Sequence, residues 1–382
     1  MNLERFDFEP WHESVNGTDL INEISNHLSA VVVLPQDADL AIALWILHSY
    51  MLLPSDEDQV INTSPILLVN SPDRQCGKST VKKILSKLVP RPALIDNISP
   101  ASLFRFIELE QPTMLIDEAD SFLVNKIDLV NVLNSGYKPD GFVFRQGGVN
   151  YQELIKFSTW SAKAIFGIGD MPDTLFSRCI WIPMKRKKAS EKVERLNVYL
   201  RQHSNDLSDL KRRILRFCID NHQLIRQVVP ELPVELDDRQ QDNWEPLLQI
   251  AEVCGSDWEK LSRAAAISLT PKNLHDETNL SEMLLADIEE IFRVFRVDRI
   301  QSAELIRQLV SDATKPWIDY RKNKPMTQYD LASLLKRYGV NPQNIRFESK
   351  VAKGYYLEDF KDAFARYLGI EVTPLQEACV PA

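Results

Sequence analysis

The stretch 67–80, LLVNSPDRQCGKST, has residue types suited to holding a nucleotide phosphate. Gly77, Lys78 and Ser79 follow an apolar run and open a helical pattern, which is the context that a phosphate-binding loop requires. Backbone N–H groups at such a helix start converge on an anion, the lysine reaches the terminal phosphates of ATP, and the serine hydroxyl ligates Mg²⁺. Pro72 stands where such loops usually open with glycine, and it removes one N–H donor. The residues expected to bind the nucleotide are Asp73, Arg74, Gln75, Cys76, Gly77, Lys78, Ser79 and Thr80.

Two acids follow a later apolar run, in TMLIDEAD. In a parallel sheet the carboxyl ends of the strands share one edge, so Asp117 and Glu118 are expected beside the phosphate loop. There Asp117 would hold Mg²⁺ together with Ser79, and Glu118 would orient the attacking water. The alternative is that these acids only favour the start of a helix.

The segment GIGDMPDTLFSRCIWI, residues 167–182, resembles the sensor and arginine-finger region of AAA+ ATPases. By this resemblance Asp170 takes the sensor position, and Arg178 enters the site of a neighbouring subunit to stabilise charge on the transferred phosphoryl group. A homo-oligomer, either a ring or an open assembly, is implied. Asp170 departs from the usual Asn; an ionised carboxylate only accepts hydrogen bonds, so it would have to hold water or an arginine. The alternative for Arg178 is an ordinary surface ion pair.

Five motifs in order resemble an uncharacterised, domain-of-unknown-function ATPase family that is common in phages, plasmids and integrated elements. They are SPILLVNSPDRQCGKST, TMLIDEAD, VLNSGY, AIFGIGDMPDTLFSRCIWIPMKRK and DRQQDNWEPLLQIAEVCGSDW. The resemblance covers roughly residues 10–370 and implies a replication-associated AAA+ or helicase-like ATPase. The letters DEAD do not indicate the large RNA helicase superfamily, because its other motifs are missing.

Apolar runs alternate with helical patterns, which predicts an α/β fold with a parallel sheet. The expected strands are 61–71, 92–96, 112–118, 162–169 and 179–184. Four segments are expected along the chain: an N-terminal helical segment over 1–60, a P-loop AAA+-like core over 61–188, an all-helical lid over 189–290 and a winged-helix-like module over 291–382. In the lid, Arg239 or Arg263 would reach a phosphate as a second sensor, while the apolar residues there are most simply core.

Basic charge is concentrated near the C-terminus, although the 382-residue chain carries a net charge of −9. Residues 291–370 contain 15 Lys and Arg against 9 Asp and Glu, a net +6 that leaves −15 elsewhere. From 301 onward the pattern is helix, helix, strand pair and helix, similar to a winged helix. Its residues expected to face DNA or RNA are Lys336, Arg337, Arg346, Lys350 and Lys353. The alternative is a solvated charged face.

The Gly-rich excursion 137–157 resembles the hairpin that lines the channel of some viral ring helicases. Lys138, Phe144 and Arg145 are therefore expected to grip a single strand through charge and stacking. The alternative is a packed hairpin whose aromatic residues serve the core.

Several classes of protein are excluded or disfavoured. The longest apolar run, 41–53, is interrupted by His48 and Ser49 and is too short to span a membrane, and no secretory signal precedes it, so a cytoplasmic protein is expected. Five scattered cysteines without a CxxC pair suggest neither disulfides nor zinc. The sequence predicts an ATP-hydrolysing AAA+ motor acting on nucleic acid, DNA rather than RNA, in mobile-element replication. The alternatives are a nucleotide-gated assembly or partner-remodelling protein, for example in phage defence, and an ATPase-dead scaffold.

Overall fold

The computed structural model describes most of the chain in two compact units, residues 1–271 and 272–382. The described residues are 6–52, 59–118, 126–147, 153–169, 171–255, 257–270, 276–312, 315–321, 324–336, 338–347 and 350–370. None of the helices in these ranges combines the length and the apolar character that crossing a membrane requires.

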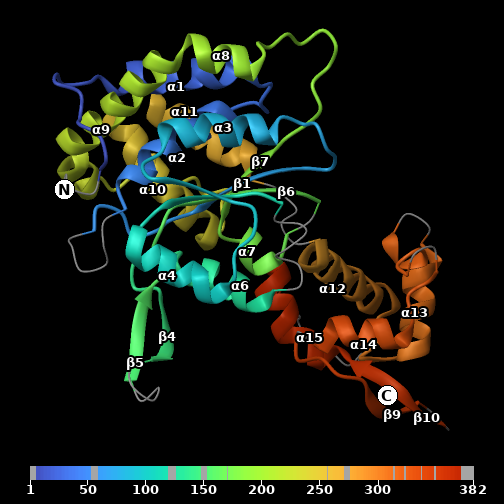
Figure 1. The fold of residues 1–382 in the computed structure, drawn as a ribbon. Helices are drawn as coiled ribbons and strands as arrows, with labels where there is room; N and C mark the ends of the chain where they lie inside the picture. Colours follow the sequence, from blue (N-terminus) through green and yellow to red (C-terminus); the bar gives the residue numbers. More distant parts are fainter. Residues whose placement is uncertain are drawn as a thin grey trace. The chain divides into compact units, whose positions relative to one another are not determined.

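A parallel sheet that includes β1, β6 and β7 lies among the helices of the first unit (Figure 1). It has five strands in the order β2-β3-β6-β1-β7. Its strands are β1 (Ile66–Ser71), β2 (Pro92–Ile95), β3 (Thr113–Ile116), β6 (Lys163–Ile168) and β7 (Cys179–Pro183). Every residue of β3 is buried, as expected for a strand covered by helices on both faces. The predicted α/β class and all five predicted strands are confirmed.

One face of the sheet packs against helices from both ends of the first unit. They are α1 (Gly17–Val31), α2 (Ala38–Tyr50), α3 (Lys78–Leu88), α8 (Leu196–Gln202), α9 (Ser204–Gln227), α10 (Asp238–Cys254) and α11 (Trp258–Leu269). Leu67 and Val69 of β1 enter this core together with Trp45, because successive strand residues point to opposite faces. The expected N-terminal segment and most of the expected lid therefore share one core with the sheet and are not separate domains.

The opposite face of the sheet is covered by α4 (Pro100–Glu110), α6 (Ile127–Ser135) and α7 (Asp173–Phe176). Ile66 and Leu68 of β1 enter this second core. An antiparallel hairpin, β4 (Phe142–Gly147) and β5 (Glu153–Ser158), extends away from the sheet past α4 (Figure 1).

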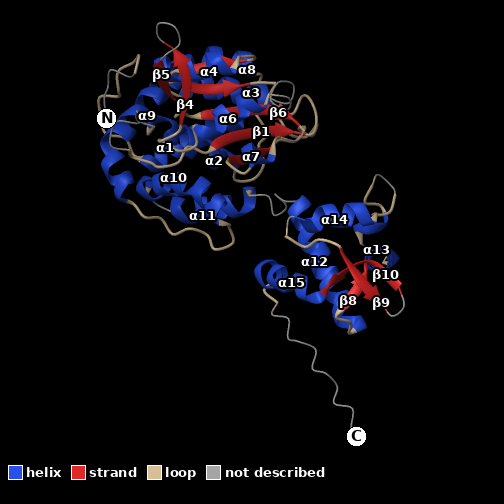
Figure 2. Cartoon of the chain, turned by 90° about the horizontal axis from the view of Figure 1, so that it is seen from below, coloured by secondary structure: helices blue, strands red, loops and turns tan. Residues whose placement is uncertain are grey.

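The second unit combines helices with a three-stranded antiparallel sheet in the order β8-β10-β9 (Figure 2). Its elements are α12 (Asp276–Phe295), β8 (Arg299–Gln301), α13 (Ser302–Ser311), η3 (Pro316–Ile318), α14 (Gln328–Lys336), β9 (Gln343–Phe347), β10 (Lys350–Tyr356), α15 (Leu357–Ala363) and the π-helical turn η4 (Phe364–Leu368). Leu285 and Phe292 of α12 pack with Trp317 and Phe360 in its core. The boundary predicted between 290 and 291 is therefore wrong, because it cuts a helix whose apolar face belongs to this unit.

Candidate functional site

The loop of residues 72–77 turns the chain from β1 into α3. Gln75 and Gly77 have positive φ angles of 63° and 91°. A Cβ atom on Gly77 would lie 2.7 Å from Cγ2 of Val32, so both the conformation and the available space require glycine. The first N–H groups of α3 have no acceptor within the helix. The β1–α3 loop therefore presents backbone donors to the space in front of the helix.

Lys78, the first residue of α3, folds its side chain back over this loop. Its Nζ donates hydrogen bonds to Oγ of Ser71 and, at 3.2 Å, to the carbonyl oxygen of Asp73. The Cys76 side chain is buried in the core, so this residue offers a ligand only its backbone. The ammonium group of Lys78 is thus held at the C-terminal edge of β1.

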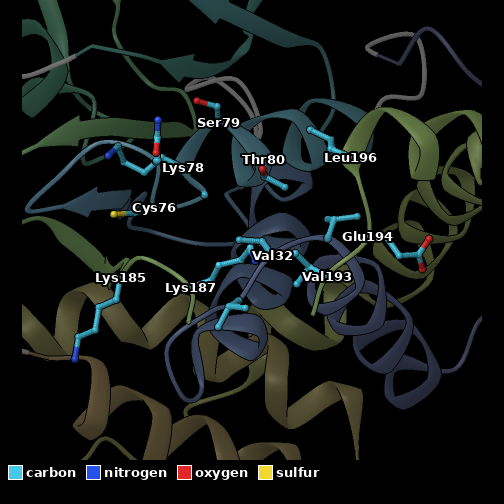
Figure 3. Close-up of a pocket in the computed structure, with 14 residues that line it drawn as sticks. Val32, Cys76, Lys78, Ser79, Thr80, Lys185, Lys187, Val193, Glu194 and Leu196 are labelled. Carbon is cyan, nitrogen blue, oxygen red and sulfur yellow. The ribbon is translucent and has the colours of Figure 1, made fainter. Parts of the chain in front are cut away.

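A pocket of about 420 Å³ opens beside the loop (Figure 3). Its loop side consists of the six predicted residues from Gln75 to Thr80, whereas Asp73 and Arg74 do not line it. The other lining residues are Val31, Val32, Val33, Lys185, Lys187, Val193, Glu194 and Leu196. A polar loop facing a mainly aliphatic wall is typical of sites for small organic ligands.

That wall joins two segments that are distant in the sequence. The N–H of Glu194 donates to the carbonyl oxygen of Ala30 at 2.8 Å, which ties the chain after β7 to the end of α1. The sequence reasoning missed these segments, because each is an ordinary helix end or loop until the fold brings it to the β1–α3 loop.

Asp117 lies directly after β3 and contacts α3. Its carboxylate accepts a hydrogen bond from Nζ of Lys82, which also lies 3.7 Å from Oδ1 of Asp96. The exposed Glu118 has a φ of 51°, and its N–H donates to Oδ1 of Asp117 at 2.9 Å. The structure thus brings Asp117 to the helix that begins with Lys78. Lys82 was missed, although its position four residues after Lys78 places both on one helix face.

The oxygen atoms of Ser79 and Asp117 suit Mg²⁺, which prefers hard oxygen ligands. Within the described ranges no three His, Cys, Asp or Glu side chains converge to form a metal site by themselves. A Mg²⁺ ion held by Ser79 and Asp117 would therefore take its other ligands from phosphate oxygens and water, as this ion does in phosphoryl-transfer sites.

Arg178 lies at the opposite edge of the sheet from the β1–α3 loop. The N–H of Ile66, the first residue of β1, donates to the carbonyl oxygen of Arg178 at 2.9 Å, whereas the loop follows Ser71 at the other end. At about 3.3 Å per residue, β1 separates these ends by about 17 Å. Arg178 therefore does not join the loop of its own chain. Asp170 lies outside the described residues.

Three cationic groups surround the buried ring of Tyr137. Cζ of Arg178, Cζ of Arg239 and Nζ of Lys138 lie 5.7, 5.4 and 5.5 Å from the ring centroid. Lys138 was expected to grip a nucleic-acid strand, but its Nζ is 3.5 Å from a carboxylate oxygen of Asp242 in this cluster. Burial raises the pKa of Tyr137, and burial together with Arg239 lowers the pKa of Arg178.

Neither arginine expected to act as a second sensor lines the pocket. Arg239 belongs to the cluster around Tyr137, and Arg263 forms ion pairs with Glu259 and, at 3.4 Å, with Glu231. The pocket therefore gives no support to a second sensor at either arginine. Helix α10 of the expected lid docks against the start of β7, where the Asn243 amide donates to the carbonyl oxygen of Cys179 at 3.5 Å.

The two faces of the β4–β5 hairpin differ. Phe144 is 52% exposed and pairs in register with Lys156, whose Nζ lies 3.4 Å from the centroid of the Phe142 ring. Arg145 points to the other face, where its Cζ lies 4.9 Å from the centroid of Phe104 in α4. Phe144 and Arg145 therefore do not act on one surface, and Lys156, which was not predicted, is the cation beside Phe144.

The basic residues of the second unit also fall on different surfaces. Arg346 is opposite Val351, two residues before Lys353, so Arg346 and Lys353 lie on one exposed face of the β9–β10 hairpin. Lys350 lies on the other face, and Lys336 is exposed at the end of α14. Arg337 lies outside the described residues.

Residues 183–367 match the family described as Protein of unknown function (DUF3631). An uncharacterised 28.9 kDa protein in the xis 5′ region of Saccharopolyspora erythraea is 32% identical over 163 residues, which are 42% of this chain and 60% of that protein. The chain thus spans less than two thirds of this relative's length.

Two apo structures of the C-terminal region of NrS-1, in the A form, are also similar to the chain. One has 11% sequence identity and a TM-score of 0.44 and covers 93% of this chain and 79% of that chain. The other has 12% identity and a TM-score of 0.38, covering 92% and 77%. The match to DUF3631 alone confirms the predicted resemblance to a family of unknown function, over residues 183–367, which begin at the last residue of β7 and extend into the second unit.

Proposed function

We propose that this chain binds ATP and Mg²⁺ at the β1–α3 loop and hydrolyses the nucleotide, as an AAA+-type P-loop ATPase. One observation carries the proposal: at the C-terminal edge of a parallel sheet, the start of α3 with Lys78 lines a pocket of about 420 Å³, and Asp117 is paired with Lys82 of the same helix. Parallel α/β sheets bind ligands at this edge.

Each group has a defined task in the proposed reaction. The N–H groups of the loop and Lys78 hold the phosphates, Ser79 and Asp117 hold Mg²⁺, and the aliphatic wall around Val32 takes the base. Glu118 orients a water molecule and receives its proton. The water oxygen bonds to the γ-phosphorus, the bond from that phosphorus to the bridging oxygen breaks, and the electron pair leaves with ADP.

The proposed ATPase works as a homo-oligomeric ring, as the resemblance of Arg178 to an arginine finger implies. Arg178 lies at the other end of β1, about 17 Å from the loop of its own chain, so it would fill the role of an arginine finger only in the site of another copy. Such an arginine stabilises the charge that develops on the transferred phosphoryl group.

Two surfaces support action on nucleic acid. Phe144 and Lys156 offer a stacking ring beside a cation, the combination that holds single strands. The second unit has the helix, strand and hairpin order of a winged helix, with Arg346 and Lys353 on one face of its hairpin. A role in the replication of a mobile element rests on the motif resemblance and on the name of the S. erythraea relative, which places it in the xis 5′ region.

The competing proposal is a nucleotide-gated assembly or partner-remodelling protein that never moves a strand. The charge distribution favours it, because the chain outside residues 291–370 carries −15. Acidic surfaces repel a nucleic-acid backbone.

One experiment separates the two proposals. ATP turnover is measured with and without single-stranded DNA or RNA while the mass of the particle is recorded, and Glu118→Gln serves to hold the ATP-bound state. Strand-stimulated turnover supports the motor. An ATP-dependent particle whose turnover is indifferent to strands supports the assembly protein, and a chain that binds no ATP contradicts both.

A further inference from the structure

Asp96 and Asp117 occupy equivalent places at the ends of two neighbouring strands. Asp96 follows β2, Asp117 follows β3, and Ile95 pairs in register with Ile116, so the two acids leave the sheet side by side. The N–H of Asp117 donates to the carbonyl oxygen of Ile95 at 2.8 Å, which continues the pairing to this point. Two carboxylates placed in this way repel each other unless a cation lies between them.

That cation is the ammonium group of Lys82 in α3. Its Nζ donates a hydrogen bond to Oδ2 of Asp117 and lies 3.7 Å from Oδ1 of Asp96. The side chains of Lys82 and Asp117 are 17% and 23% exposed, whereas the side chain of Asp96 is 77% exposed. The ammonium group is therefore held on the inner carboxylate, with a solvated carboxylate beside it.

Lys82 occupies part of the space that the proposed metal site needs. Ser79 lies three residues before Lys82, so both side chains belong to one face of α3. Oδ1 of Asp117 accepts a hydrogen bond from the N–H of Glu118 at 2.9 Å, and Oδ2 accepts one from Lys82. A divalent cation held by Ser79 and Asp117 would repel the nearby ammonium group. Lys82 must therefore leave Asp117 when such a cation binds.

We infer that Lys82 sets the affinity of the proposed site for a divalent cation. Lys82 balances the charge of Asp117 while the site is empty and moves to Asp96 when Mg²⁺ and nucleotide bind. The movement is small, because Nζ already lies 3.7 Å from Oδ1 of Asp96. The inference rests on the proposed ATP site and deepens it, since it adds a positioning residue that contacts neither the metal nor the phosphates.

Binding of Mn²⁺ to the full chain in the presence of saturating ADP tests the role of Lys82. Mn²⁺ suits the same oxygen ligands as Mg²⁺, and the electron paramagnetic resonance signal of the free ion reports binding without turnover. Lys82→Met keeps a long side chain but removes its charge. This variant should bind Mn²⁺ about tenfold more tightly, the lower end for one hydrogen bond between charged groups, because Asp96 recovers part of what Lys82 loses in the wild type.

Two further variants separate the position of Lys82 from its charge. Lys82→Arg keeps the charge and should not gain affinity for Mn²⁺. Lys83→Met removes a charge from the next residue of α3, which is exposed, and is the matched control. It should bind Mn²⁺ like the wild type, because a fully solvated charge is screened by water and salt.

A double-mutant cycle tests whether Asp96 acts through Lys82. Asp96→Asn alone should weaken Mn²⁺ binding, because the displaced ammonium group loses its acceptor. In the Lys82→Met background the same change should have far less effect. A carboxylate that only attracted the ion through space would weaken binding equally in both backgrounds, so additive effects would overturn the transfer to Asp96.

Thermal midpoints show that the effect is not a loss of folding. Without ligands, Lys82→Met should unfold at a lower temperature than the wild type, because two carboxylates lose their common cation. Mn²⁺ and ADP should raise the midpoint of Lys82→Met by more than they raise that of the wild type, since a tighter ligand stabilises the folded state more. An equal or smaller rise would overturn the inference.

The outcomes distinguish this inference from the proposed function. A wild-type chain that binds Mn²⁺ with ADP as tightly as Lys82→Met does overturns the role of Lys82 and leaves the proposed ATP site in place. A gain for Lys83→Met as large as that for Lys82→Met would show a general effect of charge and would also overturn it. A wild-type chain that binds neither ADP nor Mn²⁺ overturns the proposed function as well.

Discussion

Gly77 fixes the path of the chain at the candidate site for two independent reasons. Its φ of 91° is costly for any residue with a Cβ atom, and a Cβ atom would lie 2.7 Å from Val32. Val32 also lines the pocket, so the glycine determines the shape of the loop and its distance from the aliphatic wall.

Gly77→Ala should destabilise the first unit by more than Gly169→Ala does. Gly169 has a similar φ of 71° with nothing within 4 Å, so alanine there should cost only the left-handed backbone term, about 1–2 kcal/mol. At Gly77 the displacement of Val32 adds to this cost and should also weaken ATP binding. Urea unfolding measures the free energy of unfolding of both variants. Equal decreases would show that the contact with Val32 does not contribute to the requirement for glycine.

Residue patterns predicted part of the site. Lys78 and Asp117 were found because each follows a recognisable apolar strand, and parallel strands align their ends. The place of Arg239 could not be predicted, because it depends on how α10 docks onto β7 through the hydrogen bond from Asn243 to Cys179, and no local pattern encodes that contact. Lys82 carried a signal, its helical spacing from Lys78, but ion pairing with Asp117 depends on the register between α3 and β3.

At the scale of elements, the β4–β5 hairpin has one face with Phe144 and Lys156 and another with Arg145, which lies toward Phe104 of α4. Phe144→Ala should weaken single-strand binding because stacking on an aromatic ring contributes about 1–3 kcal/mol per base, and Lys156→Ala should weaken it because a positive charge beside the strand is lost. Arg145→Ala, on the face toward Phe104, should affect strand binding less. Fluorescence anisotropy with a labelled oligonucleotide measures all three. If Arg145→Ala and Phe144→Ala reduced the affinity for the oligonucleotide equally, the assignment of faces would be contradicted.

The β9–β10 hairpin of the second unit also has two faces, with Arg346 and Lys353 on one and Lys350 on the other. For duplex DNA binding, the logarithm of the binding constant falls linearly with the logarithm of the salt concentration. Arg346→Ala and Lys353→Ala should each make this slope shallower by about one, as expected for one lost phosphate contact. Lys350→Ala, on the opposite face, is the matched comparison and should change the slope less. Titrations at several salt concentrations give the slopes. A larger effect for Lys350 would reverse the proposed contact face.

The sequence predicted individual strands and helices better than it predicted which of them share a hydrophobic core. Alternating strands and helices gave the parallel sheet, since period and length are local properties of sequence. The grouping failed because it depends on shared cores: α1 and α2 pack with α9 and α10, and the apolar face of α12 belongs to the second unit.

At the scale of the whole molecule, the stability of the fold should depend on the pH through Lys163. This residue is fully buried at the start of β6, and its Nζ donates to the carbonyl oxygens of Gly136 and Ser161 at 2.7 and 2.6 Å. Burial lowers its pKa to about 7. Between about pH 7 and the unfolded pKa of about 10.4, the unfolded chain binds a proton that the folded chain lacks.

The free energy of unfolding should therefore rise with pH in this window, by up to about 1.4 kcal/mol per pH unit from Lys163. Lys163→Met removes the titrating group, so the difference in free energy of unfolding between wild type and variant should grow in favour of the wild type as the pH rises. Denaturant unfolding at several pH values measures it. Parallel pH profiles would show that Lys163 keeps an ordinary pKa in the folded chain.

ATP binding at the β1–α3 loop is the claim on which the rest of the account depends, and calorimetric titration of the full chain with Mg²⁺ and ATP tests it most directly. Wild type should bind, and Lys78→Ala should bind at least about tenfold more weakly, because a hydrogen bond to a charged group contributes about 1.5–3 kcal/mol. Lys83→Ala, exposed on the same helix, should bind like the wild type. Equal affinities for wild type and Lys78→Ala, or no binding by the wild type, would contradict the account.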